Sequence, residues 1–252
     1  FIYDSINQYR SDNTVSEGQM TDSATPTFSA TSTITDHERA SDQNIGTIIS
    51  AVVDRDAIEY AVGSSVTANA AAVYFTGDDN VSSGTIMNFF VDTDRASLPN
   101  KGTITAVSAA GWATTDLTET TGTKFFVEFT GAVTNVSEVL IGSKLSFEVE
   151  PDVNIQSSID YENSIQRSLG GVEYALNVNT GQEVTTIGFQ NISSTFKTNL
   201  TTMQDALKGE AKKFVWYDGS SFHWVRLDKP MTFTEIADGR FSTQLVLRQQ
   251  IQ

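Results

Sequence analysis

The sequence predicts a mainly β protein: a β-sandwich with one flanking α-helix, accompanied by a β-sandwich insertion or second domain. Three observations carry this prediction. Two Asp-Gly turns separate strand-like runs in the last third of the chain. One amphipathic stretch has helical spacing. The middle of the chain contains a series of short β-branched and aromatic runs between polar turns.

Two hairpins are predicted near the end of the chain. Asp218-Gly219 and Asp238-Gly239 each lie between two runs in which apolar residues recur, and Asp-Gly at such a position is a strong hairpin signal. The four strands of these hairpins are 213–217, 222–227, 231–236 and 241–248. In the last of them apolar and polar residues alternate, as burial of one face requires.

One helix is predicted, beginning at Ser193 or Ser194 and ending at Lys208. Either serine can cap the first turn, and Gly209 supplies the left-handed residue that commonly ends a helix. Four apolar residues, spaced by four, three and four positions, share one face of this helix: Phe196, Leu200, Met203 and Leu207. Two strands, 171–179 and 183–190, precede it, so we expect the helix to lie across an apolar sheet face.

The remainder divides into an extended segment and a β-rich region. Residues 1–44 are polar and poor in large apolar residues, which favours an extended arm that orders on a neighbour. The β-rich region contains six predicted strands: 47–53, 71–75, 85–91, 102–107, 124–129 and 144–149.

Three segments are therefore predicted. Residues 1–52 form the extended N-terminal arm and the first strand or strands, residues 53–152 form a β-rich insertion or second domain, and residues 153–252 form a β-sandwich with one helix. The second boundary follows the change of composition at Pro151-Asp152.

Charge is divided unevenly along the chain. Residues 1–163 contain 23 acidic and 7 basic residues, whereas residues 164–252 contain 8 and 9. Specific nucleic-acid binding normally requires a basic patch, so we do not expect it. An acidic surface could instead line a channel through which DNA passes without adhering, although solubility is the simpler explanation. The chain has no cysteine, which excludes disulfides and thiolate metal sites, and it contains no apolar run suited to a membrane span.

Catalytic, metal and cofactor sites are not predicted. The only histidines, His37 and His223, lie far apart in the sequence. The acidic pairs Asp54 with Asp56 and Glu148 with Glu150 share strand faces, as a glycosidase would need, but such pairs are expected by chance in an acidic chain. The turns at Asp78-Asp79-Asn80 and Asp92-Thr93-Asp94 could bind calcium, but they lack EF-hand spacing. Gly170-Gly171 lacks the pattern of a phosphate loop.

An aromatic cluster in the first C-terminal hairpin has two interpretations. Its members are Phe214, Trp216, Tyr217, Phe222 and Trp224. Packing against the helix face is favoured over an exposed carbohydrate- or partner-binding platform. In an oligomer, part of the cluster could also close a subunit interface.

The last 85 residues or so resemble minor tail proteins of long-tailed bacteriophages. The resemblance lies in an Arg-x-x-Gly-Gly segment (Arg167, Gly170, Gly171), a strand pair, one amphipathic helix and the closing hairpin strands, 214–219 to 225–230 and 241–247. It implies a tail-tube-like β-sandwich that builds trimeric or hexameric rings around the tail channel and contacts neighbouring tail proteins. It also implies a virion protein that assembles in the cytoplasm of the bacterial host.

We therefore expect a non-enzymatic virion structural protein, a minor or distal tail component that forms a ring with copies of itself. Two alternatives remain. One is a host-surface or glycan-binding adhesin, and the other is a polysaccharide-cleaving enzyme with two carboxylates in a cleft.

Overall fold

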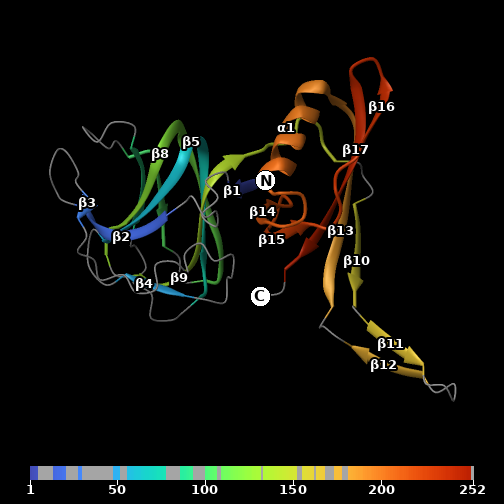
Figure 1. Ribbon diagram of the computed structural model, residues 1–252, viewed down its shortest axis with the longest axis horizontal. Helices are drawn as coiled ribbons and strands as arrows, with labels where there is room; N and C mark the ends of the chain where they lie inside the picture. The colour runs from blue at the N-terminus through green and yellow to red at the C-terminus, as the bar shows by residue number, and fades with distance from the viewer. Residues whose placement is uncertain are drawn as a thin grey trace. The chain divides into compact units, whose positions relative to one another are not determined.

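The computed structural model confirms a mainly β fold with one helix, and every strand pair that it describes is antiparallel. It describes residues 1–4, 14–20, 28–29, 48–51, 56–77, 86–92, 100–106, 109–131, 133–151, 155–161, 163–167, 173–177 and 181–250. The contacts divide the chain into two units (Figure 1). Unit 1 is Phe1–Leu145 with Tyr217–Phe222, and unit 2 is Ser146–Trp216 with His223–Gln252. No helix among the described residues is long and apolar enough to cross a membrane.

Unit 1 is a β-sandwich made largely from two long strands. Its strands are β1 (Ile2–Asp4), β2 (Thr14–Met20), β3 (Phe28–Ser29), β4 (Ile49–Ala51), β5 (Asp56–Phe75), β6 (Ile86–Asp92), β7 (Gly102–Thr105), β8 (Gly111–Phe129) and β9 (Val133–Lys144). β5 pairs with β8 along most of its length, with a register shift between Ala61 and Val66. The first half of β5 also pairs with β2, and the second half pairs with β9.

The two halves of β5 enclose one apolar core. Ile58 and Tyr60 from the first half join Val73 and Phe75 from the second half in a single buried cluster. β6, β8 and β9 contribute further members: Met87, Phe89, Val91, Phe125, Val127, Phe129, Val136, Val139 and Ile141. The alternation of these residues along each strand gives each layer one core-facing side.

Unit 2 is a sheet with a helix on one face. Its elements are β10 (Gln156–Asp160), β11 (Asn163–Arg167), β12 (Glu173–Asn177), β13 (Gln182–Ser193), α1 (Ser194–Ala206), β14 (Lys213–Tyr217), β15 (Phe222–Leu227), β16 (Phe233–Ala237) and β17 (Arg240–Gln249). Tyr217 and Phe222, the residues of β14 and β15 next to their turn, are grouped with unit 1. β17 pairs with β13 along one side, and with β15 and β16 along the other. β10 pairs with β13 beyond it.

The predicted helix and its apolar face are confirmed, but α1 ends at Ala206 and not at Lys208, because Lys208 already has a left-handed backbone with φ 53°. Ser193 is the N-cap and accepts a hydrogen bond from Phe196 N, and Gly209 adopts φ 68° just after the helix end. The helix packs on β13 and β17, where the ring of Phe196 meets that of Phe189 at a centroid distance of 6.3 Å. Leu200 and Met203 are fully buried on the same face.

Both predicted hairpin turns are also confirmed. β14 and β15 are joined at Asp218-Gly219, where Asp218 Oδ1 accepts hydrogen bonds from the backbone nitrogens of Ser220 and Ser221 at 2.7 Å. β16 and β17 are joined by Asp238-Gly239, and Gly239 has φ 65°. The aspartate-backbone bonds and the positive φ of glycine explain why this dipeptide predicts turns so well.

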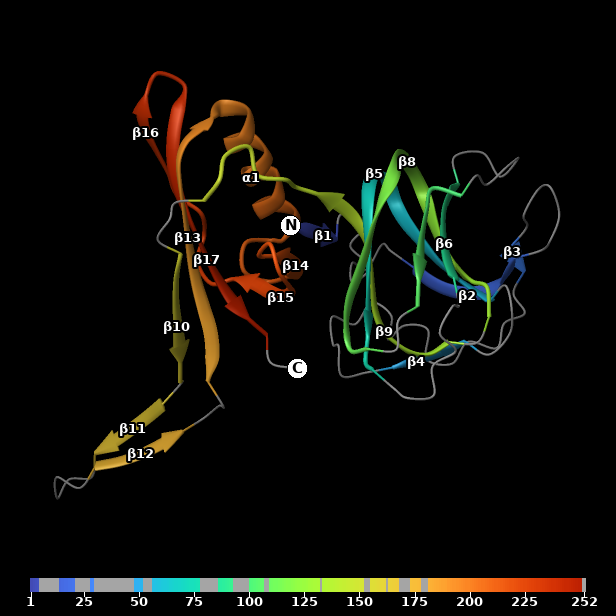
Figure 2. The same cartoon turned by 180° about the vertical axis from the view of Figure 1, so that it is seen from behind.

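A two-stranded hairpin continues from the edge of the unit 2 sheet. Asp160 pairs with Gln182 at the end of the β10–β13 ladder, and β11 and β12 then pair from Asn163 to Arg167 (Figures 1 and 2). We call β11 and β12 the hairpin extension. The Gly170-Gly171 pair of the sequence resemblance lies outside the described residues.

Several sequence predictions differ from the structure. The strand predicted at 124–129 is the end of β8, which begins at Gly111, and β2 and β9 were not predicted. The strand predicted at 144–149 is wrong, because β9 ends at Lys144 and the chain then leaves the sheet. Glu148 in this segment instead accepts a hydrogen bond from Ser193 N, at the start of the helix. The strand predicted at 71–75 is only the end of β5, which begins at Asp56. The residues before 71 were not predicted as strand, and most of them are small, uncharged residues such as Ser and Ala.

The units also divide differently from the predicted segments. β1, β2 and β4 come from the predicted N-terminal segment 1–52, yet they pair with β9 and β5 of unit 1. Most of residues 1–52 lie outside the described part of the chain. The units separate between Leu145 and Ser146. That residues 53–152 form an insertion able to fold by itself stays a prediction.

Leu200→Ala should lower the free energy of unfolding by about 2–5 kcal/mol, because the substitution leaves a cavity under the helix. Asn199→Ala is the matched control, since Asn199 is an exposed neighbour on the same helix. Urea denaturation followed by tryptophan fluorescence measures both, and Trp216 and Trp224 report on unit 2. A loss below about 0.5 kcal/mol for Leu200→Ala would contradict burial of this face.

Candidate binding surfaces on unit 2

The predicted packing and interface residues separate into a buried and an exposed group. Seven of them are buried: Phe196, Leu200, Met203, Leu207, Phe214, Trp216 and Trp224. The other two, Tyr217 and Phe222, stack at a centroid distance of 4.7 Å, and Tyr217 is 48% exposed. The aromatic cluster is therefore mostly core, and only its turn end is open to a partner.

Two strands of the unit 2 sheet, β10 and β16, have one described neighbour each, whereas β15 and β14 continue the sheet beside β16. Among the described strands, β10 pairs only with β13, and β16 pairs only with β17. Every residue of β16 after Phe233 is exposed, and Ile236 is 52% exposed. Backbone donors and acceptors along such edges can pair with another strand.

Three exposed apolar residues lie on and beside β10, with Ile159 and Tyr161 at the base of the hairpin extension and Ile155 before the other end of the strand. Ile155, Ile159 and Tyr161 are 49%, 61% and 49% exposed. Tyr161 and Ile159 lie over Gly181, where an added Cβ would come within 2.6 Å of the tyrosine ring and 2.8 Å of the isoleucine. Gly181 also has φ 82°, so glycine is needed there for both backbone and space. Ile155, Ile159 and Tyr161 together form an exposed apolar strip along β10.

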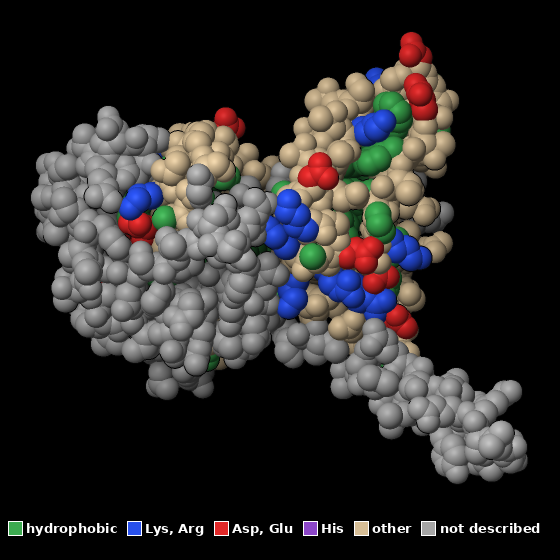
Figure 3. All heavy atoms as spheres, viewed as in Figure 1, with side chains coloured by type: hydrophobic (Ala, Val, Ile, Leu, Met, Phe, Trp, Pro, Cys, Tyr) green, Lys and Arg blue, Asp and Glu red, His purple; other side chains and the backbone are tan. Residues whose placement is uncertain are grey.

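A buried arginine holds the base of the hairpin extension. Arg248 Nε donates to Asp228 Oδ1 at 2.6 Å, Nη2 donates to Asp160 Oδ2 at 2.8 Å, and Nη1 donates to Gln182 Oε1 at 3.3 Å. Asp160 ends β10 and Gln182 begins β13, so these bonds connect β17 to the point where the extension starts. We call these four residues the Arg248 cluster. Figure 3 shows that acidic and basic side chains also lie side by side on the face of unit 2 turned to the viewer.

The Arg248 cluster keeps its cation charged. The hydrogen bond that Arg248 donates to the Asp228 carboxylate is the main cause that raises the pKa of Arg248 above its ordinary value, and it outweighs the effect of burial. Because the arginine side chain is only 10% exposed, its charge depends on these carboxylates for compensation. The Arg248 cluster is therefore a structural anchor.

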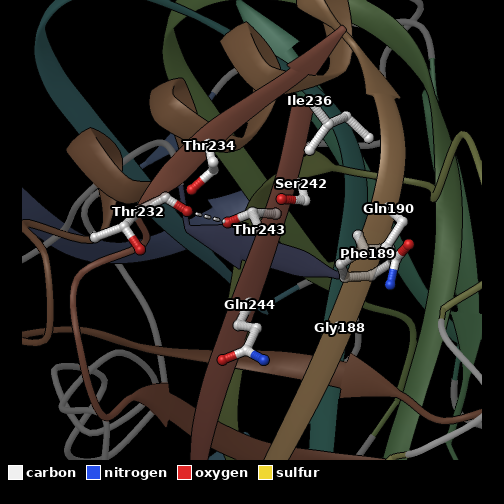
Figure 4. Close-up of a pocket in the computed structure, with 9 residues that line it drawn as sticks. All are labelled: Gly188, Phe189, Gln190, Thr232, Thr234, Ile236, Ser242, Thr243 and Gln244. Carbon is white, nitrogen blue, oxygen red and sulfur yellow. Dashed lines mark hydrogen bonds between the residues drawn. The ribbon is translucent and has the colours of Figure 1, made fainter. Parts of the chain in front are cut away.

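A hollow of about 460 Å³ opens on the sheet face opposite the helix (Figure 4). Phe189 and Leu245 face the helix side, so Gly188 and Gln244, one residue away along β13 and β17, face outward. Nine residues line the hollow: Gly188, Phe189, Gln190, Thr232, Thr234, Ile236, Ser242, Thr243 and Gln244. None of them is charged.

Two irregularities shape this hollow. β13 has a register shift between Phe189 and Ile192, and Asn191 in the shift has φ 61°, a conformation that asparagine tolerates better than most residues. β16 has a second shift between Glu235 and Ala237. Both neighbours of β17 are thus bulged over the same stretch, and bulges increase the local twist of a sheet.

The acidic and histidine candidates that the structure describes do not lie together in one site. Asp56 is fully buried in unit 1, and Glu148 binds the start of the helix. His223 is half-buried and its ring lies 5.3 Å from that of Trp216. His37, Asp54, Asp94 and the turn at 78–80 lie outside the described residues. Within the described residues, no group of three or more His, Asp or Glu is placed to hold a metal ion.

Neither the Arg248 cluster nor the hollow was predicted from the sequence. Asp160 and Arg248 are separated by 88 positions, so no local pattern connects them. A signal for the hollow did exist. Gly188 interrupts a strand-like run, and glycine inside a strand often marks a bulge or a close approach of another group.

No protein-family model matches the chain, and no curated protein gives a significant match. Several solved structures that resemble part of it are carbohydrate-binding modules. CBM32 of AlyQ, in complex with 4,5-unsaturated mannuronic acid, is 24% identical, covers 41% of this chain and 83% of its own, and has a TM-score of 0.35. The family 32 module of Clostridium perfringens NanJ, in complex with galactose, is 12% identical and covers 52% and 93%, with a TM-score of 0.37.

A third similar structure is the C-terminal domain of a chitobiase from Bacteroides fragilis. It is 10% identical, covers 52% of this chain and 93% of its own, and has a TM-score of 0.39. Because all three TM-scores are below 0.5, we base no argument about function on these structures.

Arg248→Met should destabilise unit 2 by about 2–4 kcal/mol, because it leaves the Asp228 and Asp160 carboxylates without their cation. Arg226→Met is the matched control, since Arg226 lies opposite Arg248 on β15 and makes no ion pair with a described residue. Urea denaturation measures the loss. Hydrogen exchange should also become faster at 156–160 and 182–186, and equal effects of the two substitutions would show that Arg248 is not an anchor.

Proposed function

We propose that this chain is a non-enzymatic structural subunit of a virion tail, in which unit 2 assembles with other copies into a closed ring. The observation that carries the proposal is that one sheet has two different open edges, β10 and β16. The resemblance of the last third of the sequence to bacteriophage tail proteins supports the assignment to a virion that assembles in the bacterial cytoplasm.

Because the two edges differ, each copy can pair its β10 edge with the β16 edge of the next copy in a head-to-tail series. When the β10 edge of one copy meets the β16 edge of another, each subunit keeps one edge available for a further copy. Such a head-to-tail contact forms a ring if its rotation closes. Trimers and hexamers are the expected rings.

The apolar strip of Ile155, Ile159 and Tyr161 adds a contact beside the β10 edge. Apolar surface is unfavourable in water, so burying this strip against a neighbouring copy would stabilise the contact by about 25 cal/mol for each Å² of apolar surface buried. The hairpin extension begins at the same place. Two-stranded hairpins have little stability of their own, so a neighbouring subunit or tail protein would support it.

The charge distribution is compatible with this function. The acidic load lies before residue 164, and the last part of the chain is nearly neutral. A near-neutral ring-forming unit avoids strong repulsion between copies. Specific DNA binding is not part of the proposal, although DNA would pass through the channel of a tail ring.

Glycan binding, as in a host-surface adhesin, is a second candidate function. The observation that favours it is the hollow on unit 2, whose lining consists entirely of uncharged groups. The third possibility, polysaccharide cleavage, requires two carboxylates facing one cleft, and the lining of this hollow contains none.

Ring formation can be tested with two edge variants. Ile159→Lys places a charge at the β10 edge, and Ile236→Lys places one at the β16 edge, where lysine discourages strand pairing. The unmodified chain should have a mass three or six times its 27.4 kDa in light scattering and form rings in negative-stain images. Each variant alone should be monomeric.

Mixing the two variants distinguishes a head-to-tail contact from a symmetric one. An equimolar mixture should form dimers and nothing larger, because only one intact pair of edges remains. Asn199→Lys, on the exposed helix surface, is the control and should form rings. A monomeric unmodified chain at 100 μM, or rings formed by either edge variant alone, would overturn the proposed assembly.

A further inference from the structure

We infer that the hollow formed by β13, β16 and β17 binds an uncharged saccharide. This inference rests on the second candidate function, glycan binding, and locates its site on unit 2. The hollow opens on a sheet face, and the proposed subunit contacts use the edges of β10 and β16, so that Ile236 on β16 is shared by the hollow and one edge.

The polar groups of the hollow are available to a ligand. Within the described part of the chain, no hydrogen bond engages the side chains of Gln190, Thr234, Ser242 or Gln244. Figure 4 shows these side chains arranged around the hollow, from three neighbouring strands. Amides and hydroxyls can both donate and accept, as can each hydroxyl of a sugar. A saccharide can therefore use all four groups without leaving a charge unpaired.

The hollow also contains an exposed apolar side chain, and no side chain projects from Gly188 at its base. Ile236 lies at its rim and is 52% exposed, so its side chain can pack against the C–H face of a pyranose ring. Gly188 lies opposite Gln244 and contributes no side chain to the floor. The volume of about 460 Å³ is within the range of small-molecule sites.

The lack of charge in the lining selects for neutral ligands. The nearby cation Arg240 is directed to Asn191 O at 3.4 Å and to Glu148 Oε1 at 3.9 Å. A uronic acid or sialic acid would bring a carboxylate to a hollow that has no cation to receive it, and an uncompensated charge is costly to desolvate. Neutral hexose or N-acetylhexosamine units are therefore the expected ligands.

The framework of the site is held by the sheet. Ser242 and Gln244 belong to β17, which is paired on both sides, and Thr243 Oγ1 between them donates to Thr232 O at 2.8 Å. This bond fixes the entry to β16 next to the hollow. A site built on paired strands needs little ordering when the ligand binds.

Calorimetry with the full chain tests the inference. The probes are maltotetraose, cellotetraose, chitotetraose and β-1,4-galactotetraose, with tetragalacturonate as the anionic comparison. At least one neutral probe should bind, and tetragalacturonate should bind at least about tenfold more weakly. Gly188→Leu, which fills the hollow, and the double variant Gln190→Ala with Gln244→Ala should each weaken binding about tenfold or more.

Thr186→Leu is the matched control, because Thr186 lies on the same strand and the same face two residues outside the hollow. Its affinity should stay within about twofold of the unmodified chain. If Gly188→Leu does not fold, the double variant carries the test. Full binding by the variants would place the glycan site elsewhere and overturn the inference while leaving glycan binding intact.

Two other results have different meanings. If no neutral probe binds the unmodified chain, both the site and the glycan-binding function are overturned. Stronger binding of tetragalacturonate than of any neutral probe would overturn the neutral class. Ring formation is measured independently by mass, so neither result bears on the structural function.

Discussion

Strand β17 is the element on which the rest of unit 2 depends. Its backbone pairs with β13 on one side and with β15 and β16 on the other, and its side chains alternate between two tasks. Leu245 and Leu247 face the core under the helix, while Gln244 faces the hollow and Arg248 anchors the hairpin extension. Because the strand period is two, a slip of one residue would bury the polar set and expose the leucines. One register thus fixes the core, the hollow and the base of the extension together.

Local chemistry explains which parts of this fold could be predicted from the sequence. The helix face, its serine cap and its terminal glycine act within one or two turns, and both Asp-Gly turns act within four residues. These features were visible because their partners are close in sequence. The strand at 144–149 was predicted wrongly because the contact that decides its structure is distant in sequence. Leu145 and Phe147 alternate as in a strand, but the segment after Lys144 is drawn to the start of the helix by Glu148, whose partner Ser193 is 45 positions away.

The functional surfaces depend on contacts that the sequence does not display. The hollow needs a bulge in β13, a second bulge in β16 and the pairing of both strands with β17, and only the glycine at 188 was a local sign of it. The Arg248 cluster joins residues from three places in the chain. The segment that contains β10 was not predicted as a strand, and the exposure of its apolar side chains became evident only when the described strands placed β10 at the sheet edge.

The bulge in β13 also fixes the number of residues that the segment 189–192 can have. Phe189 and Ile192 are three residues apart, an odd interval that would place them on opposite faces of a regular strand, yet both are fully buried. The extra residue at Asn191 restores the phase, so that β13 can end at the helix cap with its apolar side still facing inward. Insertions or deletions of a single residue in 189–192 would break this phase, whereas the exposed turn at Asp238-Gly239 carries no such requirement. Related sequences should therefore vary in length at the turn and keep their length at the bulge.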